Sequence, residues 1–134
     1  MTASMPAAIR RWHDVAEARD VAGLDTLLAE EAVFESPVVH TPQVGKAITT
    51  RYLAAAFKVL NNEAFHYPNQ WFGERSAVLE FATEIDGITV NGIDMITWDD
   101  NDRITHFKVM IRPLKAINIV HEKMRETLMA TARP

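Results

Sequence analysis

Two segments carry most of the information about the architecture of this chain: DVAGLDTLLAEEAVFESPVVHTPQVGKAITTRY, residues 20–52, and NGIDMITWDDNDRITHFKVMIRP, residues 91–113. In the first, Asp20 is a suitable cap for a short helix that runs to Leu28. A short strand, Ala32–Ser36, comes next and is ended by a proline. The following stretch, Val38–Gly45, is expected to be a loop because it contains a proline and a glycine.

The residues around these segments extend the pattern. Helices are expected over residues 5–19 and 48–60, where apolar residues recur at helical spacing. Four strands are expected: Ala64–Phe72, Ala77–Ile85, Ile88–Trp98 and Ile104–Ile111. Short turns separate them, among them the favoured hairpin pair Asp86-Gly87, so the strands should form an antiparallel meander. A last helix after Pro113 carries one apolar stripe, at Leu114, Ile117, Val120, Met124 and Leu128. Helices followed by a meander of strands is the order of an α+β domain.

The composition is that of one soluble globular domain, spanning residues 1–134. The chain has 48% hydrophobic residues, a formal net charge of −4 and no cysteine. The lack of cysteine excludes disulfides and suits a cytoplasmic protein. Residues 1–15 lack the apolar core of a signal peptide, and no apolar run is long enough to span a membrane. The negative charge argues against nucleic-acid binding.

The two quoted segments resemble the fold shared by nuclear transport factor 2 (NTF2), ketosteroid isomerase and SnoaL-type polyketide cyclases. The resemblance runs from about residue 12 to about residue 117. It implies an NTF2-like, SnoaL-like architecture, in which a cone-shaped, curved antiparallel sheet is covered by N-terminal helices. The C-terminal helix is an addition to that pattern. The resemblance also implies a pocket for a small, largely apolar molecule and no organic cofactor.

Three positions of ketosteroid isomerases are carried over by this resemblance. Their helical tyrosine corresponds to Trp12, and their catalytic base, in a Glu-Asp-Pro run, corresponds to Ser36. Their second acid is retained as Asp94. That reaction needs a base and two hydrogen-bond donors for the oxyanion. Serine is not a general base on its own, and tryptophan donates only through its indole N–H. Ketosteroid isomerisation by that mechanism is therefore not expected.

Asp94 is the main catalytic candidate, because its strand neighbours are apolar. A carboxyl group in an apolar cavity keeps its proton and becomes a hydrogen-bond donor. The alternative is a core acid paired with a neighbouring group. His40, in the loop expected to rim the pocket, is a second candidate, as a general base or as a solvent-facing loop residue. The five histidines form no HxH or HExxH pair, so no metal site is expected.

Strand alternation predicts the pocket walls. If Asp94 faces the pocket, so do Val90 and Ile96. The strand pairing that the resemblance implies adds Leu79, Phe81, Phe107, Val109 and Ile111 as ligand-binding candidates, and the carried-over positions add Trp12 and Ser36. The outer face then carries Glu80, Glu84, His106, Lys108, Met110 and Arg112, and the family pattern makes that face a homodimer contact. In the reverse arrangement, Glu80, Lys108 and Arg112 would line the pocket and bind an anion.

Three functions remain open from the sequence. The first is a cofactor-independent enzyme that performs isomerisation, cyclisation or hydrolysis through Asp94. The second is a binding module that holds its ligand without turning it over. The third is a protein-interaction domain of the nuclear transport factor 2 type, in which the pocket is incidental.

Overall fold

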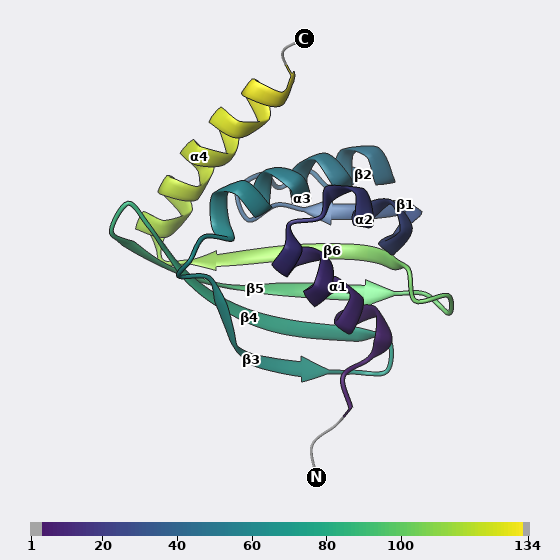
Figure 1. Ribbon diagram of the computed structural model, residues 1–134. Coiled ribbons are helices and arrows are strands. Elements are labelled where there is room, and N and C mark those ends of the chain that lie inside the picture. Colours follow the sequence, from purple (N-terminus) through teal and green to yellow (C-terminus); the bar gives the residue numbers. More distant parts are fainter. Residues whose placement is uncertain (1–3, 133–134) are drawn as a thin grey trace.

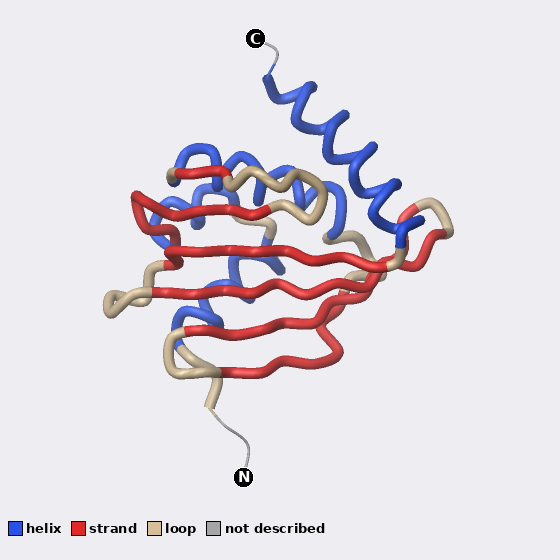
Figure 2. The backbone as a smooth tube through the Cα atoms, turned by 180° about the vertical axis from the view of Figure 1, so that it is seen from behind, coloured by secondary structure: helices blue, strands red, loops and turns tan. Residues whose placement is uncertain are grey.

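The computed structural model describes residues 4–132, with side chains up to residue 130. The elements are α1 (Ala7–Ala18), α2 (Val21–Leu27), β1 (Leu28–Glu35), β2 (Gln43–Val44), α3 (Lys46–Leu60), β3 (His66–Phe72), β4 (Ser76–Ile85), β5 (Ile88–Trp98), β6 (Ile104–Arg112) and α4 (Leu114–Ala132). The strands form one curved sheet in the order β2-β1-β6-β5-β4-β3. Helices α1, α2 and α3 all cover the same face of this sheet (Figure 1). Seen from behind, the other face is bare (Figure 2). The predicted α+β class is confirmed.

The predicted meander is confirmed, with strand ends within two residues of the prediction. Strands β3, β4, β5 and β6 pair antiparallel in chain order. Asp86 and Gly87 join β4 to β5 with φ angles of 50° and 80°. Two positive φ angles in a two-residue turn match the right-handed twist of the flanking strands. The cap at Asp20 is also confirmed, because its Oδ1 accepts a 3.0 Å bond from the backbone N–H of Gly23.

Three details of the N-terminal half differ from the prediction. The short helix ends at Leu27, and the strand predicted over Ala32–Ser36 is longer, since β1 spans Leu28–Glu35. The expected loop contains the two-residue strand β2, which pairs with β1 through Val33 and Val44. In addition, β1 runs parallel to β6. The pairing of β1 with β6 joins residues far apart in the sequence, so a local pattern does not reveal it.

Alternation along the strands settles which face of the sheet is covered. Leu79 and Phe107 are fully buried under the helices, whereas Glu80 and Lys108 lie on the bare face and are only half-buried. Asp94 pairs in register with Leu79 and with Val109, so all three face the helices. The first of the two predicted arrangements is therefore correct, and the charged row lies outside.

The covered face is packed closely enough to require a glycine in β5. A Cβ atom on Gly92 would lie 2.4 Å from Cζ of Phe81 and 2.5 Å from the carbonyl oxygen of Met110. Real Cβ atoms do not approach other atoms this closely, and a backbone carbonyl cannot move aside. Gly92 thus gives Phe81 its place in the core.

Helix α4 follows β6 directly and packs against α3, while its C-terminal half extends past the end of the sheet (Figure 1). A hollow lined mainly by apolar side chains lies along the strip between α3 and α4. No helix within residues 4–132 is long and apolar enough to cross a membrane.

Candidate functional site

An apolar groove of about 250 Å³ lies between α3, α4, β6 and the loop that follows β1. We call this hollow the apolar groove. Its lining residues are Phe34, Ser36, Pro37, Val38, Val39, Arg51, Tyr52, Ala56, Leu60, Val109, Ile111, Val120, His121, Met124, Arg125, Leu128 and Met129. Most of these side chains are aliphatic or aromatic, as in most small-molecule sites.

A second, much smaller hollow lies deeper in the cone. This inner cavity has a volume of about 30 Å³. Its lining residues are Trp12, Phe34, Leu53, Ala56, Phe57, Leu60, Asn61, Phe65, Tyr67, Phe81, Asp94, Phe107 and Val109. Phe34, Ala56, Leu60 and Val109 also line the groove, so these side chains border both spaces. The inner cavity has room for a water molecule or for one carbonyl or hydroxyl group, but not for a ring.

Three polar side chains from distant elements meet at the inner cavity. The indole N–H of Trp12 on α1 donates to the phenol oxygen of Tyr67 on β3, at 3.1 Å. The Tyr67 hydroxyl donates in turn to Oδ2 of Asp94 on β5, at 2.8 Å. Asp94 is only 6% exposed. An apolar core that contains such a chain of donors and acceptors is costly to build unless every polar atom has a partner, and each of these has one.

Burial changes the acidity of both titrating groups. Burial raises the pKa of Asp94 from 3.8 to about 7, although the hydrogen bond from Tyr67 acts in the opposite direction. Burial and the charge of Asp94 raise the pKa of Tyr67 well above its ordinary value, against the effect of the bond from Trp12. Near neutral pH, Asp94 therefore exists in both protonation states while Tyr67 stays protonated. A protonated Asp94 can donate to a ligand oxygen, and an ionised Asp94 can accept a proton.

Aromatic rings hold this pair in place. The ring of Trp12 lies 4.7 Å from that of Phe107, and the ring of Phe34 lies 5.3 Å from that of Tyr52. Phe34 and Phe107 are themselves stacked at 6.2 Å. These contacts connect α1, α3, β1 and β6 and fill the cone up to the inner cavity, so water has little access to Asp94.

The structure distributes the predicted ligand-binding residues over three environments. Trp12, Phe81 and Phe107 line the inner cavity together with Asp94. Ser36 and Ile111 line the groove, and Val109 lines both hollows. Leu79, Val90 and Ile96 are fully buried core residues that line neither of them.

Ser36 and His40, the two candidates near the rim of the groove, differ in position. Ser36 borders the groove, but its Oγ accepts bonds from the backbone N–H groups of Val38, at 3.0 Å, and Val39, at 3.3 Å. Its hydroxyl thus holds the turn after β1. His40 is exposed in the same loop and is not among the residues that line the groove. The structure does not bring His40 to Asp94, and its catalytic role stays a prediction.

Sequence reasoning missed two parts of the site. Tyr67 supplies the phenol that Trp12 cannot, from β3 and not from α1. The signal was its alternation with Phe65, which puts both rings on the covered face of the sheet. The other part is α4, for which the sequence predicted an apolar stripe but no place in the site. Met124 and Leu128 of that stripe line the groove, whereas Leu114 is 71% exposed.

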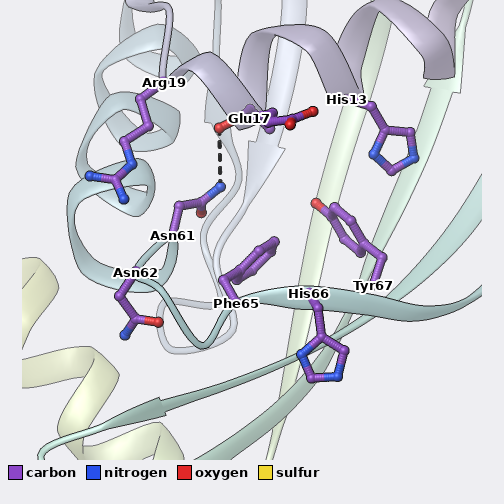
Figure 3. Close-up of a pocket in the computed structure, with 9 residues that line it drawn as sticks. His13, Glu17, Arg19, Asn61, Asn62, Phe65, His66 and Tyr67 are labelled. Atoms are coloured by element: carbon purple, nitrogen blue, oxygen red, sulfur yellow. Dashed lines mark hydrogen bonds between the residues drawn. The ribbon is translucent and has the colours of Figure 1, made fainter.

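Tyr67 also borders a polar cleft of about 330 Å³ on its other side (Figure 3). The cleft lies between α1, the loop after α3 and the start of β3. Its lining residues are His13, Ala16, Glu17, Arg19, Asn61, Asn62, Phe65, His66 and Tyr67. His13 makes a 2.6 Å hydrogen bond to Gln70, and Asn61 donates to the carbonyl of Ala16. Among the side chains that the structure describes, no group of three His, Asp or Glu residues is placed to hold a metal ion.

Solved structures with the same architecture include two that cover nearly the whole chain. A steroid delta-isomerase from Pseudomonas aeruginosa is 36% identical, with a TM-score of 0.89 over 94% of this chain and 92% of its own. An uncharacterized protein with a cystatin-like fold from Silicibacter pomeroyi is 26% identical, with a TM-score of 0.88 over 96% of this chain and 90% of its own.

A more distant structure shares the fold alone. SalBIII, an epoxide hydrolase/cyclase-like enzyme in pyran ring formation of salinomycin, is 18% identical, with a TM-score of 0.63 over 78% of this chain and 88% of its own. None of the curated proteins matches the chain with significance. The sequence model of the SnoaL-like domain matches residues 9–107, which is most of the chain. The protein therefore belongs to the family of SnoaL-like domains.

Proposed function

We propose that this protein binds a small, largely apolar molecule in the apolar groove and holds an oxygen atom of that molecule at Tyr67 and Asp94. The observation that carries the proposal is the 2.8 Å bond between Tyr67 and Asp94 beside a cavity of about 30 Å³, next to the groove. A buried phenol and a buried carboxyl are polar groups that an apolar core does not need. Their position in a small cavity beside the apolar groove suits recognition of a carbonyl or hydroxyl group.

The chemistry of the pair favours a carbonyl group. A neutral Asp94 can donate its proton to a ligand oxygen while the Tyr67 hydroxyl donates to Asp94, and this chain of donors stabilises the negative charge that develops on the oxygen when a neighbouring C–H bond is broken. The same site would support isomerisation or cyclisation if a base reached that C–H bond. Binding needs only the donors, so we place binding first and catalysis second.

A matched pair of probes tests this proposal. 2-Octanone carries the carbonyl, and 2-methyl-1-octene has the same shape with a methylene group in place of the oxygen. We expect the ketone to raise the melting temperature of the wild type clearly more than the alkene does, because ligands that bind the native state stabilise it. In the Tyr67→Phe/Asp94→Leu variant, both partners of the buried bond become apolar, so the ketone should lose this advantage.

The alkene is the internal control of that experiment. The alkene should raise the melting temperature of the wild type and of the double variant by the same amount, because the apolar groove is unchanged. Equal effects of the ketone and the alkene on the wild type would overturn the assignment of Tyr67 and Asp94. Absence of any effect from both probes would overturn the groove as a binding site.

Steroid isomerisation is the second candidate, and it is favoured by the 36% identity to the Pseudomonas aeruginosa isomerase. A protonated Asp94, to which the Tyr67 hydroxyl donates, provides a donor for such a reaction. Two observations speak against it. The position of the base holds Ser36, whose hydroxyl is used in the turn after β1. The inner cavity is also too small for a steroid ring to reach Asp94. Isomerisation of a smaller ketone remains compatible with the geometry.

We also propose that the bare face of the sheet pairs with a second copy of the chain. Trp71 and Met110 are 56% and 45% exposed on this face. Glu80 accepts bonds from Asn69 and Asn91 beside Arg112, and together they lower the pKa of Glu80. A face that carries apolar side chains and charges of both signs is self-complementary under a twofold axis.

Light scattering coupled to gel filtration tests the dimer. We expect the wild type to elute as a dimer and the Trp71→Lys/Met110→Lys variant to elute as a monomer, because buried lysines would repel across the axis. Val44→Lys, at an apolar residue that is 71% exposed on the opposite edge of the sheet, is the matched control and should remain dimeric. A monomeric wild type would contradict this part of the proposal.

A further inference from the structure

The rim of the apolar groove has an uneven distribution of charge. Arg51 of α3 and His121 and Arg125 of α4 line it, and no aspartate or glutamate does. The whole chain, in contrast, has a formal net charge of −4. A rim with only basic side chains on an acidic protein gives the groove a local positive potential, which attracts anions.

The two arginines are not used in ion pairs with other described side chains. Arg51 donates from Nη2 to the backbone carbonyl of Leu128, at 3.0 Å, and so joins α3 to α4 across the groove. A guanidinium group has five N–H donors. That bond fixes the side chain of Arg51 at the rim while most of its donors stay available to a ligand.

The acids of α4 point to a different side of the helix. Glu122 and Glu126 act electrostatically on Lys123, which pairs with Asp86 at 3.3 Å. They are not among the residues that line the groove. The carboxylates nearest to the positive rim in the sequence therefore lie outside the lining of the groove.

Building on the proposed function, we infer that the ligand of the groove is an amphipathic carboxylate, with an apolar body and an anionic end. The apolar body lies along Phe34, Tyr52 and Met124. The carbonyl end points towards Tyr67, and the carboxylate lies at the rim between Arg51 and Arg125. Arginine suits this task because its planar group forms paired hydrogen bonds with a carboxylate.

Calorimetric titration with 7-oxooctanoate tests the inference. This compound is 2-octanone with a carboxylate on its far end, and its methyl ester is the uncharged match. We expect the carboxylate to bind the wild type about tenfold or more tightly than the ester, since hydrogen bonds to charged groups are strong. The difference should shrink at high salt, because the rim is partly exposed.

Arg125→Gln removes one rim charge without touching any bond that α4 makes to α3. We expect this variant to bind 7-oxooctanoate several-fold more weakly than the wild type does and to bind the ester with unchanged affinity. The Arg51→Gln/Arg125→Gln variant should lose the preference for the carboxylate over the ester. Arg103→Gln, at an exposed arginine in the turn between β5 and β6, is the control and should keep the wild-type preference.

The outcomes separate this inference from the proposed function. Equal binding of carboxylate and ester to the wild type would overturn the anionic ligand but leave the ketone site intact. An undiminished preference in the double arginine variant would also overturn it. If neither 7-oxooctanoate nor its ester binds, the proposed function fails, and the inference fails with it.

Discussion

Asp94→Asn is expected to make the protein more stable than the wild type above neutral pH, by about 4 kcal/mol at pH 8.5. Burial raises the pKa of Asp94 from 3.8 to about 7. Each pKa unit corresponds to about 1.4 kcal/mol between the protonated and ionised forms. The amide has nearly the same shape, does not ionise, and its oxygen can still accept the bond from Tyr67.

The pH dependence has a definite sign. Between pH 3.8 and about 7, the folded protein binds the Asp94 proton and the unfolded chain releases it. The free energy of unfolding therefore falls as the pH rises through this window. The contribution of Asp94 is fully present below pH 3.8 and is lost above about pH 7. The advantage of the amide variant should thus be close to zero at pH 4 and largest at alkaline pH.

Urea unfolding of both proteins from pH 4 to pH 8.5 measures this difference. Asp14→Asn, which changes an exposed carboxylate on α1, is the matched control and should differ from the wild type by little at any pH. An Asp94→Asn variant that is less stable than the wild type at pH 8.5 would show that the charged form of Asp94 stabilises the fold.

Phe107→Ala is expected to cost about 3–5 kcal/mol of unfolding free energy. The ring of Phe107 is 1% exposed and packs between those of Trp12 and Phe34. Its removal would leave an empty space next to the inner cavity, and the surrounding rings are held from several elements and cannot close it. Urea unfolding at one pH measures the loss.

The cavity left by that substitution provides a second readout. Benzene should raise the melting temperature of Phe107→Ala more than that of the wild type, because apolar cavities of this kind stay dry and bind small apolar molecules. Leu114→Ala is the control. Because Leu114 is 71% exposed, this substitution should change the free energy of unfolding by less than about 0.5 kcal/mol. A loss below about 1 kcal/mol in Phe107→Ala would mean that the aromatic packing is loose and rearranges.

The strands and helices followed from the sequence where hydrophobic periodicity and turn residues agree. The β4–β5 hairpin is the clearest case, because alternation on both sides of Asp86-Gly87 sets its register. Leu27 and Leu28 are the opposite case. An apolar pair at a boundary fits a helix or a strand equally well, and the pairing of β1 with β6, which is distant in sequence, decides the outcome.

Only part of the candidate site could be predicted from the sequence. Asp94 was indicated by the resemblance and by its apolar neighbours. Tyr67 was not, because its contact with Asp94 depends on how β3 and β5 are placed on either side of β4. The basic rim was likewise hidden, since it arises where Arg51 on α3 and Arg125 on α4 come together. Such constellations depend on packing between elements, which local patterns do not encode.

The most direct measurement is the ¹³C NMR spectrum of 2-octanone labelled at its carbonyl carbon and bound to the protein. Donation from Asp94, which itself accepts the Tyr67 proton, polarises the C=O bond, so the bound resonance should move downfield in the wild type. It should return towards the value of an apolar surrounding in Tyr67→Phe/Asp94→Leu. A bound resonance at the same position in both proteins would contradict the claim that this pair holds the ligand oxygen.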